Sequence, residues 1–282
     1  MRLLTATMPA NYDLALVSDM HEGNRGCSHE GQADFREWLM GGNNRFFCHG
    51  GDAIEAITTD DGRYVYNKDQ DAPIPLQQAQ AVAEQYKPCR KRCLAWMAGN
   101  HEGMLHRVGD LTRDVICKDI GVKYGGRIMK LALNDRHGLQ FKLFYVHPSR
   151  TTIRSNAKDY TQQQANKLAR LKMLLEQKAG DCLVMGIAHV HQLLVLDPVP
   201  RLILADDGES IHQRYLGAGD GAAGYIAPDR RWYCATGSFL RSQMLGTDGY
   251  AEVAMYDPVE LGYIVVEVRD RKVVAVRRVV GR

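Results

Sequence analysis

Short apolar runs punctuate the chain, and several of them lead directly into polar side chains that can bind metals. Runs of this length and composition predict strands, here at residues 13–18, 45–48, 94–98, 139–146 and 182–187. Between the runs, apolar positions three or four residues apart predict helices at 29–40, 76–87, 104–119 and 160–178. Alternation of strands and helices is typical of an α/β fold.

The remaining segments are less regular. Residues 122–146 alternate around the turn residues 134–138, which predicts a hairpin ending in strand 139–146. The polar segment 58–75 predicts an exposed loop or hairpin, a kind of segment that often determines substrate choice. In the final third, a second sheet is predicted from short apolar runs separated by turn residues, at 193–196, 201–205, 232–235, 262–268 and 272–280.

Candidate ligands stand where the first two strands end. Asp19 and His21 follow strand 13–18, and residues two apart in an extended segment share a face, so both side chains can point at one centre. Taken alone, the pair also fits a plain turn. Asp52 follows two glycines that let the backbone turn tightly, and its two oxygens could each serve one ion.

The tetrapeptide 99–102, Gly-Asn-His-Glu, follows strand 94–98. Asn100 offers a neutral carbonyl oxygen to a cation, His101 can pass a proton near neutral pH, and Glu102 can hold the other nitrogen of that imidazole. A turn with a capping Asn explains the same four residues, so the tetrapeptide alone is only suggestive.

Further candidates follow the later strands. His147 ends the predicted hairpin, and His189 and His191 follow the strand at 182–187. A lone histidine is usually a core or surface residue, but that explanation must cover five histidines near strand ends. Arg150 and Arg154 lie just beyond His147 and are candidates to clamp anionic substrate oxygens.

Composition restricts the class of protein only broadly. The 282 residues are 45% hydrophobic and 24% charged, as in an ordinary globular protein, and no linker divides them, so a single domain over 1–282 is expected. A net charge of +3 neither demands nor excludes a nucleic-acid partner. Seven cysteines, an odd number, favour reduced thiols in the cytoplasm, and no run has the length of a secretory or membrane-spanning segment.

Taken in order, the five blocks resemble the signature of the calcineurin-like metallophosphoesterase superfamily: Asp-x-His, Gly-Asp-x-x-(Asp/Glu), Gly-Asn-His-(Asp/Glu), His and Gly-His-x-His. The resemblance spans residues 19–191. It implies a four-layer α/β/β/α sandwich of two mixed sheets and two divalent metal ions bridged by Asp52. Manganese fits the mixed ligands well, and iron, zinc or nickel are possible. The implied ligands are Asp19, His21, Asp52 and His191 for one ion, and Asp52, Asn100, His147 and His189 for the other.

The resemblance also implies an activity, hydrolysis of a phosphate ester by metal-bound hydroxide without a covalent intermediate. Asp52, His101 and Glu102 would be the catalytic residues, with His101 as the general acid oriented by Glu102, while Arg150, Arg154 and Asn100 would contact substrate.

The sequence departs from the pattern in two places. Ala188 replaces the glycine before His-x-His. Ala56 and Ile57 follow Glu55, where protein serine/threonine phosphatases of the superfamily carry Arg-Gly. The missing arginine favours a phosphodiesterase acting on a nucleotide or nucleic acid.

Alternative functions stay open at this stage. One is a nuclease of the DNA-repair type, which needs a basic groove; the candidates for it are Arg90, Lys91, Arg92, Arg150 and Arg154. Others are a phosphomonoesterase of small molecules and a catalytically silent member that binds metal or nucleotide. Residues 236–242, with 250–252 after them, resemble uncharacterised phage-type members of the superfamily.

Overall fold

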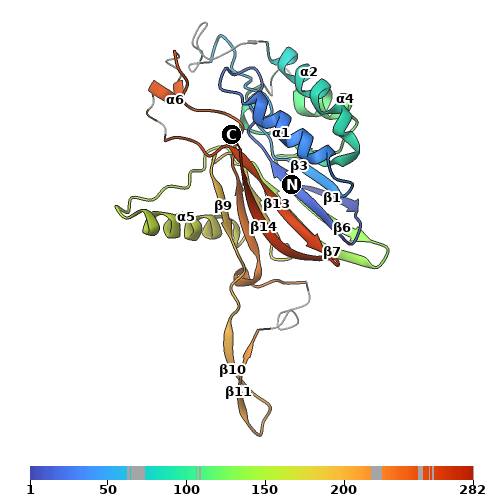
Figure 1. The fold of residues 1–282 in the computed structure, drawn as a ribbon, viewed down its shortest axis with the longest axis vertical. Coiled ribbons are helices and arrows are strands. Elements are labelled where there is room, and N and C mark those ends of the chain that lie inside the picture. The colour runs from blue at the N-terminus through green and yellow to red at the C-terminus, as the bar shows by residue number, and fades with distance from the viewer. Residues whose placement is uncertain are drawn as a thin grey trace.

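The computed structural model contains two six-stranded mixed sheets that pack face to face (Figure 1). It describes residues 1–61, 64, 74–105, 107, 109–216, 224–246, 250–253, 255 and 257–281. The first sheet consists, in spatial order, of β14 (Lys272–Val280), β13 (Gly262–Arg269), β2 (Tyr12–Val17), β3 (Arg45–His49), β4 (Cys93–Met97) and β5 (Tyr124–Gly126). The second consists of β1 (Arg2–Thr7), β6 (Ile128–Asp135), β7 (Gly138–Val146), β8 (Val184–Ile187), β12 (Trp232–Thr236) and β9 (Leu193–Leu196).

Helices cover the outer faces of both sheets. The helices α1 (His29–Met40), α2 (Pro75–Tyr86) and α4 (Lys118–Ile120) share one apolar core with the first sheet. On the other side, α5 (Tyr160–Leu175) packs against the second sheet (Figure 1). The architecture is therefore the four-layer α/β/β/α sandwich predicted from the sequence.

A third core fills the space between the sheets and explains the continuous apolar runs. Leu14 and Leu16 of β2 point into this space, where they join residues such as Leu131 and Leu143 of the second sheet. Their neighbours Ala15 and Val17 point to the helical side. A strand covered on both faces has no polar side, so its sequence shows a run rather than an alternation.

Parallel pairing determines where the polar ends of these strands meet. The strands β2, β3 and β4 are mutually parallel, and so are β7 and β8 in the facing sheet. The carboxyl ends of parallel strands lie at one edge of a sheet, which is where ligands bind in open α/β sheets. The motif segments follow these strand ends at 19–22, 50–55, 99–102, 147–150 and 188–191.

Several elements match their predicted ranges closely, including α1, α2 and the hairpin β6–β7. The helix predicted at 104–119 is confirmed only in its second part, where helical structure covers 111–120 through the π-helix η2 (Thr112–Cys117) and α4. Before it, a short helix α3 (Asn100–Met104) begins earlier than predicted, because the Glu102 carboxylate accepts the backbone N–H of Gly99. Most of the loop predicted at 58–75 lies outside the described residues, which omit 62–63 and 65–73.

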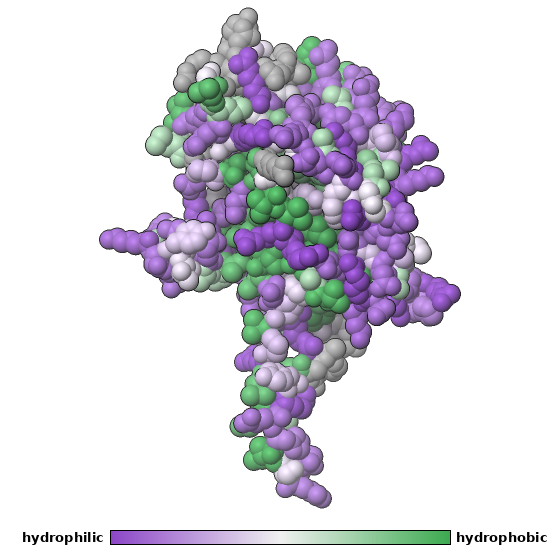
Figure 2. All heavy atoms as spheres, in the orientation of Figure 1, coloured by the Kyte–Doolittle hydropathy of each residue, from purple (hydrophilic) through white to green (hydrophobic). Residues whose placement is uncertain are grey.

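The prediction of a separate C-terminal sheet was also wrong. β13 pairs with β2 and extends the first sheet, whereas β12 pairs with β8 and extends the second. The strands β10 (Leu202–Asp206) and β11 (Ile211–Tyr215) form a two-stranded ribbon that projects from the body (Figures 1 and 2). β11 was not predicted, because all five of its residues are exposed and no burial pattern marks it. None of the helices in the described part of the chain has the length and apolarity needed to cross a membrane.

Candidate metal centre

Asp19 and His21 reach the site through an unusual backbone. Both residues have left-handed conformations, with φ of 54° and 53°, so the extended segment assumed from the sequence is not what brings them together. Hydrogen bonds fix the turn: the N–H of Asp19 donates to Gly51 O at 2.9 Å, and the N–H of His21 donates to Asp52 O at 3.1 Å. The end of β2 is thus tied directly to the loop after β3.

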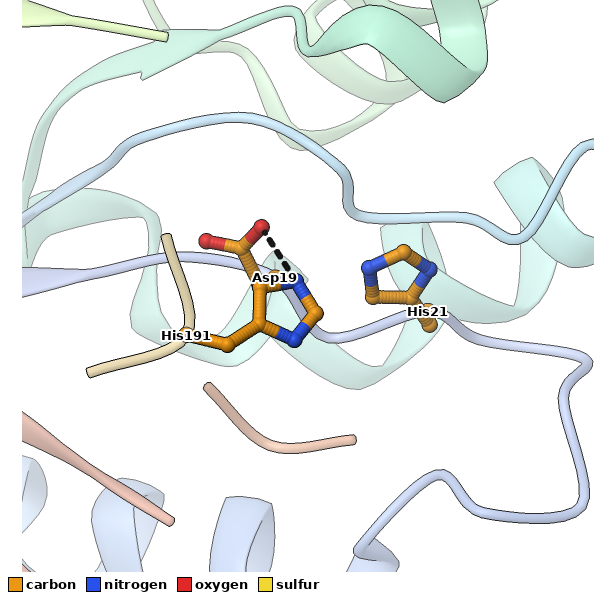
Figure 3. Close-up of side chains that lie close together, drawn as sticks. All are labelled: Asp19, His21 and His191. Carbon is orange, nitrogen blue, oxygen red and sulfur yellow. Dashed lines mark ion pairs between the residues drawn. The ribbon is translucent and has the colours of Figure 1, made fainter. Parts of the chain in front are cut away.

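The first ligand cluster contains Asp19, His21 and His191, whose ligand atoms all lie within 4.8 Å of one another. Asp19 Oδ1 lies 3.1 Å from His191 Nε2, and the rings of His21 and His191 are 5.5 Å apart (Figure 3). Asp19 and His21 are buried. Each contact joins residues that are far apart in sequence, as the resemblance implied for one metal ion.

The second cluster contains Asp52, His147 and His189, again with ligand atoms within 4.8 Å. His147 Nε2 lies 3.1 Å from Asp52 Oδ2 and 3.0 Å from Asn100 Oδ1. His147 Nδ1 lies 2.8 Å from Gly50 O. Because a carbonyl only accepts, Nδ1 carries the proton in that bond and Nε2 faces the cluster.

Asp52 lies between the two clusters. Its Oδ2 is 3.1 Å from His147 Nε2 and 4.0 Å from His21 Nε2, while Oδ1 accepts the backbone N–H of His101 at 2.8 Å. Oδ2 thus lies near residues of both clusters, while Oδ1 also holds the backbone of the segment that carries His101. Whether each oxygen serves one ion stays a prediction.

The residues present fit two divalent ions. His21 Nε2 is buried, points toward Asp52 and has no hydrogen-bond partner among the described residues. The carboxylate, amide and imidazole donors suit a first-row transition metal. Backbone strain also gathers here, since positive φ angles between 51° and 75° occur at Asp19, His21, Asp52, His189 and His191. A non-glycine residue in this region costs on the order of 1 kcal/mol or more, and such strain clusters at functional sites.

Electrostatics at the centre favour positive charge. Burial raises the pKa of Asp52, but the charges of His147 and His101 outweigh it and hold that pKa well below its usual range. Burial lowers the pKa of His147, but the charge and hydrogen bond of Asp52 outweigh it and raise it to about 9. Burial, together with the charge of His147, lowers the pKa of His189 to about 4. Asp52 and His147 thus attract each other strongly at the centre, where a cation could take the place of a proton.

Glu55 orients two rings of the site, a role the sequence reasoning missed. Its Oε2 lies 2.7 Å from His21 Nδ1 and 3.8 Å from His101 Nδ1, and its backbone O lies 2.5 Å from His101 Nδ1. These contacts place Nδ1 of each ring against Glu55 and leave the Nε2 atoms for the centre and the cavity. The only sequence signal was the position of Glu55 three residues after Asp52.

Glu102 does not have the role predicted for it. Its carboxylate accepts backbone N–H groups, from Gly99 at 2.8 Å, Ala53 at 2.7 Å and Asp52 at 3.2 Å. It therefore joins the loops that carry Asp52 and Asn100, and the residue that faces the His101 ring is Glu55.

Two cavities open beside the centre. One of about 320 Å³ is lined by His101, His191 and Arg154, and the other, of about 540 Å³, by Arg150 and by Arg127, which was not predicted. Asn100 lines both cavities. Both predicted arginines therefore lie near the centre.

Arg127 precedes β6 and donates to Ser149 Oγ at 3.0 Å and to His147 O at 3.5 Å. No strand-end motif pointed to it.

The basic cluster at Arg90, Lys91 and Arg92 lies elsewhere. These residues belong to the 3₁₀ helix η1 (Lys87–Arg92), which precedes β4, whereas the site follows β4. The five-residue strand separates the two ends by roughly 16 Å. Arg92 instead donates to Asn43 O and stacks over Phe46. The prediction that this cluster shares a groove with Arg150 and Arg154 was wrong, because it occupies the opposite edge of the sheet.

Comparison with known proteins agrees with this arrangement. Residues 12–212 match the family model of calcineurin-like phosphoesterases. No curated protein matches the sequence. Among solved structures, Yfce, a phosphoesterase from E. coli, is 11% identical, with 94% of this chain and 98% of that chain covered and a TM-score of 0.41. A conserved uncharacterised protein from Streptococcus pneumoniae TIGR4, a predicted phosphoesterase, is 11% identical, with 96% and 99% covered and a TM-score of 0.33.

Proposed function

The chain belongs to the calcineurin-like phosphoesterase family, and from that premise we propose that it hydrolyses a phosphodiester, of a nucleotide or nucleic acid, with two divalent cations. The observation that carries this proposal is Asp52 Oδ2, which faces one ligand cluster at 4.0 Å and the other at 3.1 Å. When bound, the two cations would polarise a phosphoryl oxygen and lower the pKa of an attacking water. Manganese is the cation that we expect, with iron, zinc or nickel as alternatives.

The ligand residues have distinct tasks in this proposal. Asp19, His21 and His191 hold one cation, and Asn100, His147 and His189 hold the other, with Asp52 serving both. Glu55 keeps the His21 ring in position, and the peptide N–H of His101 keeps Asp52 in position. The charge of the phosphate ester is met by Arg154 in one cavity and Arg150 in the other.

His101 is the residue we propose as the general acid. Its Nδ1 donates to the backbone O of Glu55, because a carbonyl can only accept. The ring is largely buried but lines the cavity beside the centre, where Nε2 can give a proton to the leaving oxygen.

The two cavities support a diester over a monoester. A diester has two substituents on the phosphorus, and Asn100 of the centre lines two cavities, of about 320 Å³ and about 540 Å³, that could each take one. The first is lined partly by apolar residues such as Ile153, Val190 and Val259, which suit an aromatic or sugar group. Ala56 and Ile57 are both buried and offer no charge to a terminal phosphate.

A rate comparison tests the proposal. Bis(p-nitrophenyl) phosphate and p-nitrophenyl phosphate share a leaving group, and we expect the diester to be cleaved faster in added manganese. Faster cleavage of the monoester would indicate a small-molecule phosphatase, and no cleavage of either would indicate a protein that only binds. Asp19→Asn is the matched control, since activity that survives it does not come from this centre.

A further inference from the structure

A second set of metal-ligating side chains lies outside the dinuclear centre, in the segment between β2 and α1. Its members are Glu22, Cys27 and His29, whose ligand atoms lie within 4.8 Å of one another. Cys27 Sγ is 3.9 Å from Glu22 Oε2 and 3.9 Å from His29 Nδ1, and His29 Nδ1 is 3.6 Å from Glu22 Oε2. One oxygen, one sulfur and one nitrogen thus form a nearly regular triangle.

The size of this triangle matches a tetrahedral zinc site. Zinc bond lengths place a sulfur about 3.5 Å from its oxygen or nitrogen neighbours, and an oxygen about 3.3 Å from a nitrogen. The three observed separations are longer by only a few tenths of an ångström, which side-chain rotation can close. We propose that Glu22, Cys27 and His29 bind a zinc ion or a similar thiolate-preferring divalent cation, with the fourth position open to solvent.

Neighbouring amides orient two of the three ligands. Gln32 of α1 donates to Cys27 Sγ at 3.0 Å, and Gln85 of α2 donates to Glu22 Oε2 at 3.2 Å. Gln32 is fully buried. A donor directed at sulfur stabilises the thiolate form that binds metal, and such supporting contacts are a regular part of metal sites.

The cluster is open to solvent on one side. Cys27 is 4% exposed whereas the His29 side chain is 59% exposed, so an ion can enter from the His29 side and keep a water there.

The position of the cluster indicates a structural task. Glu22 directly follows the ligand His21, and Cys27 forms a β-bridge with Leu240, which lines the smaller cavity. Ser28 N also donates to Phe239 O, at 2.6 Å. An ion held here would brace the segment 22–29 after β2, whose backbone in turn pairs with the segment after β12.

Sulfur makes the site separately observable. The proposed ligands of the dinuclear centre are oxygen and nitrogen atoms only, so a thiolate-to-cobalt charge-transfer band reports on a cysteine site alone. The experiment is a Co²⁺ titration of the purified chain after chelation, followed by near-ultraviolet absorption. We expect a band whose full intensity corresponds to one cobalt–thiolate site per chain, in addition to the cobalt taken up by the dinuclear centre. The band should be lost in Cys27→Ser and unchanged in Cys93→Ser, which alters a cysteine outside the cluster.

A second variant covers the case in which Cys27→Ser fails to fold. His29→Ala changes a mostly exposed side chain, so the fold should persist. The affinity of the thiolate site for cobalt, measured from the band, should fall at least 10-fold. Absence of the band in the unaltered chain, its persistence in Cys27→Ser, or its loss in Cys93→Ser would each overturn the proposal. None of these outcomes depends on phosphoesterase activity, so this proposal and the proposed function can fail separately.

Discussion

Replacement of His101 by alanine removes the ring that we propose as the proton donor and leaves the ligand clusters in place. The ring belongs to neither of the two clusters, although it lies with His21 and Glu55 in a further group of potential ligands. Its backbone N–H, which holds Asp52, remains in the variant. A general acid typically contributes about 10²- to 10⁴-fold in rate. That range corresponds to roughly 2.7 to 5.5 kcal/mol of barrier. The vacated contact at Glu55 O also leaves a buried carbonyl unpaired, at a cost to folding of about 1 to 3 kcal/mol.

The assay separates proton donation from other roles by varying the leaving group. Loss of a sugar alkoxide from a dinucleotide needs a proton, whereas p-nitrophenolate leaves as a stable anion. We therefore expect the full loss with a dinucleotide and a much smaller loss with bis(p-nitrophenyl) phosphate, at unchanged manganese content. Equal losses with both substrates would refute the role as an acid, and loss of metal would make His101 a ligand.

Two other substitutions test the surroundings of the centre. Glu55→Ala should weaken manganese binding about 10- to 100-fold, measured by titration, because His21 Nδ1 loses the carboxylate 2.7 Å away that orients it. Glu55→Gln, whose amide oxygen can still accept this bond, should recover most of the affinity. Asp181→Asn should lower the free energy of unfolding by about 1 kcal/mol at neutral pH, because Asp181 accepts from Lys130 at 2.5 Å and Lys142 at 2.7 Å.

The pKa of Asp181 predicts how the effect of Asp181→Asn on the free energy of unfolding changes with pH. Burial raises the pKa of Asp181, but the hydrogen bonds from Lys130 and Lys142 outweigh it and lower that pKa. A lowered pKa in the folded state means that the stabilisation is complete above the unfolded pKa of about 4, shrinks as the pH falls below it, and vanishes only as the pH falls through the still lower folded pKa. Urea unfolding of the unaltered protein and of Asp181→Asn should therefore differ most at pH 7, and the difference should narrow steadily as the pH falls below about 4. A difference that does not narrow in acid, or unchanged manganese affinity in Glu55→Ala, contradicts the respective argument.

The strands that carry the site could be predicted because burial on both faces makes them continuous apolar runs. Val17 faces the helices and Leu16 faces the other sheet, so no polar position interrupts the run. The C-terminal strands could not be assigned to their sheets, because β12 and β13 are both apolar runs and nothing in either run names its partner strand. Their places depend on pairing with β8 and β2, which lie far away along the chain.

The candidate ligands could be predicted as residue types at strand ends, whereas their contacts could not. A sequence does not show that the N–H of His101 donates to Asp52 Oδ1. It also does not show that Glu102 binds backbone amides while Glu55 faces the imidazoles. The left-handed conformations of Asp19 and Asp52 were likewise not predicted, because residue type favours that conformation only weakly.

The central claim is that Asp52 bridges two cations, and manganese binding tests it most directly. The measurement is manganese content together with electron paramagnetic resonance, made in a Cys27→Ser background so that the sulfur site adds nothing. The account predicts two manganese ions per chain with exchange-coupled spectra, and loss of both ions in Asp52→Asn, because one oxygen faces both clusters at 3.1 and 4.0 Å. One ion per chain, two uncoupled ions, or full binding in Asp52→Asn would contradict it.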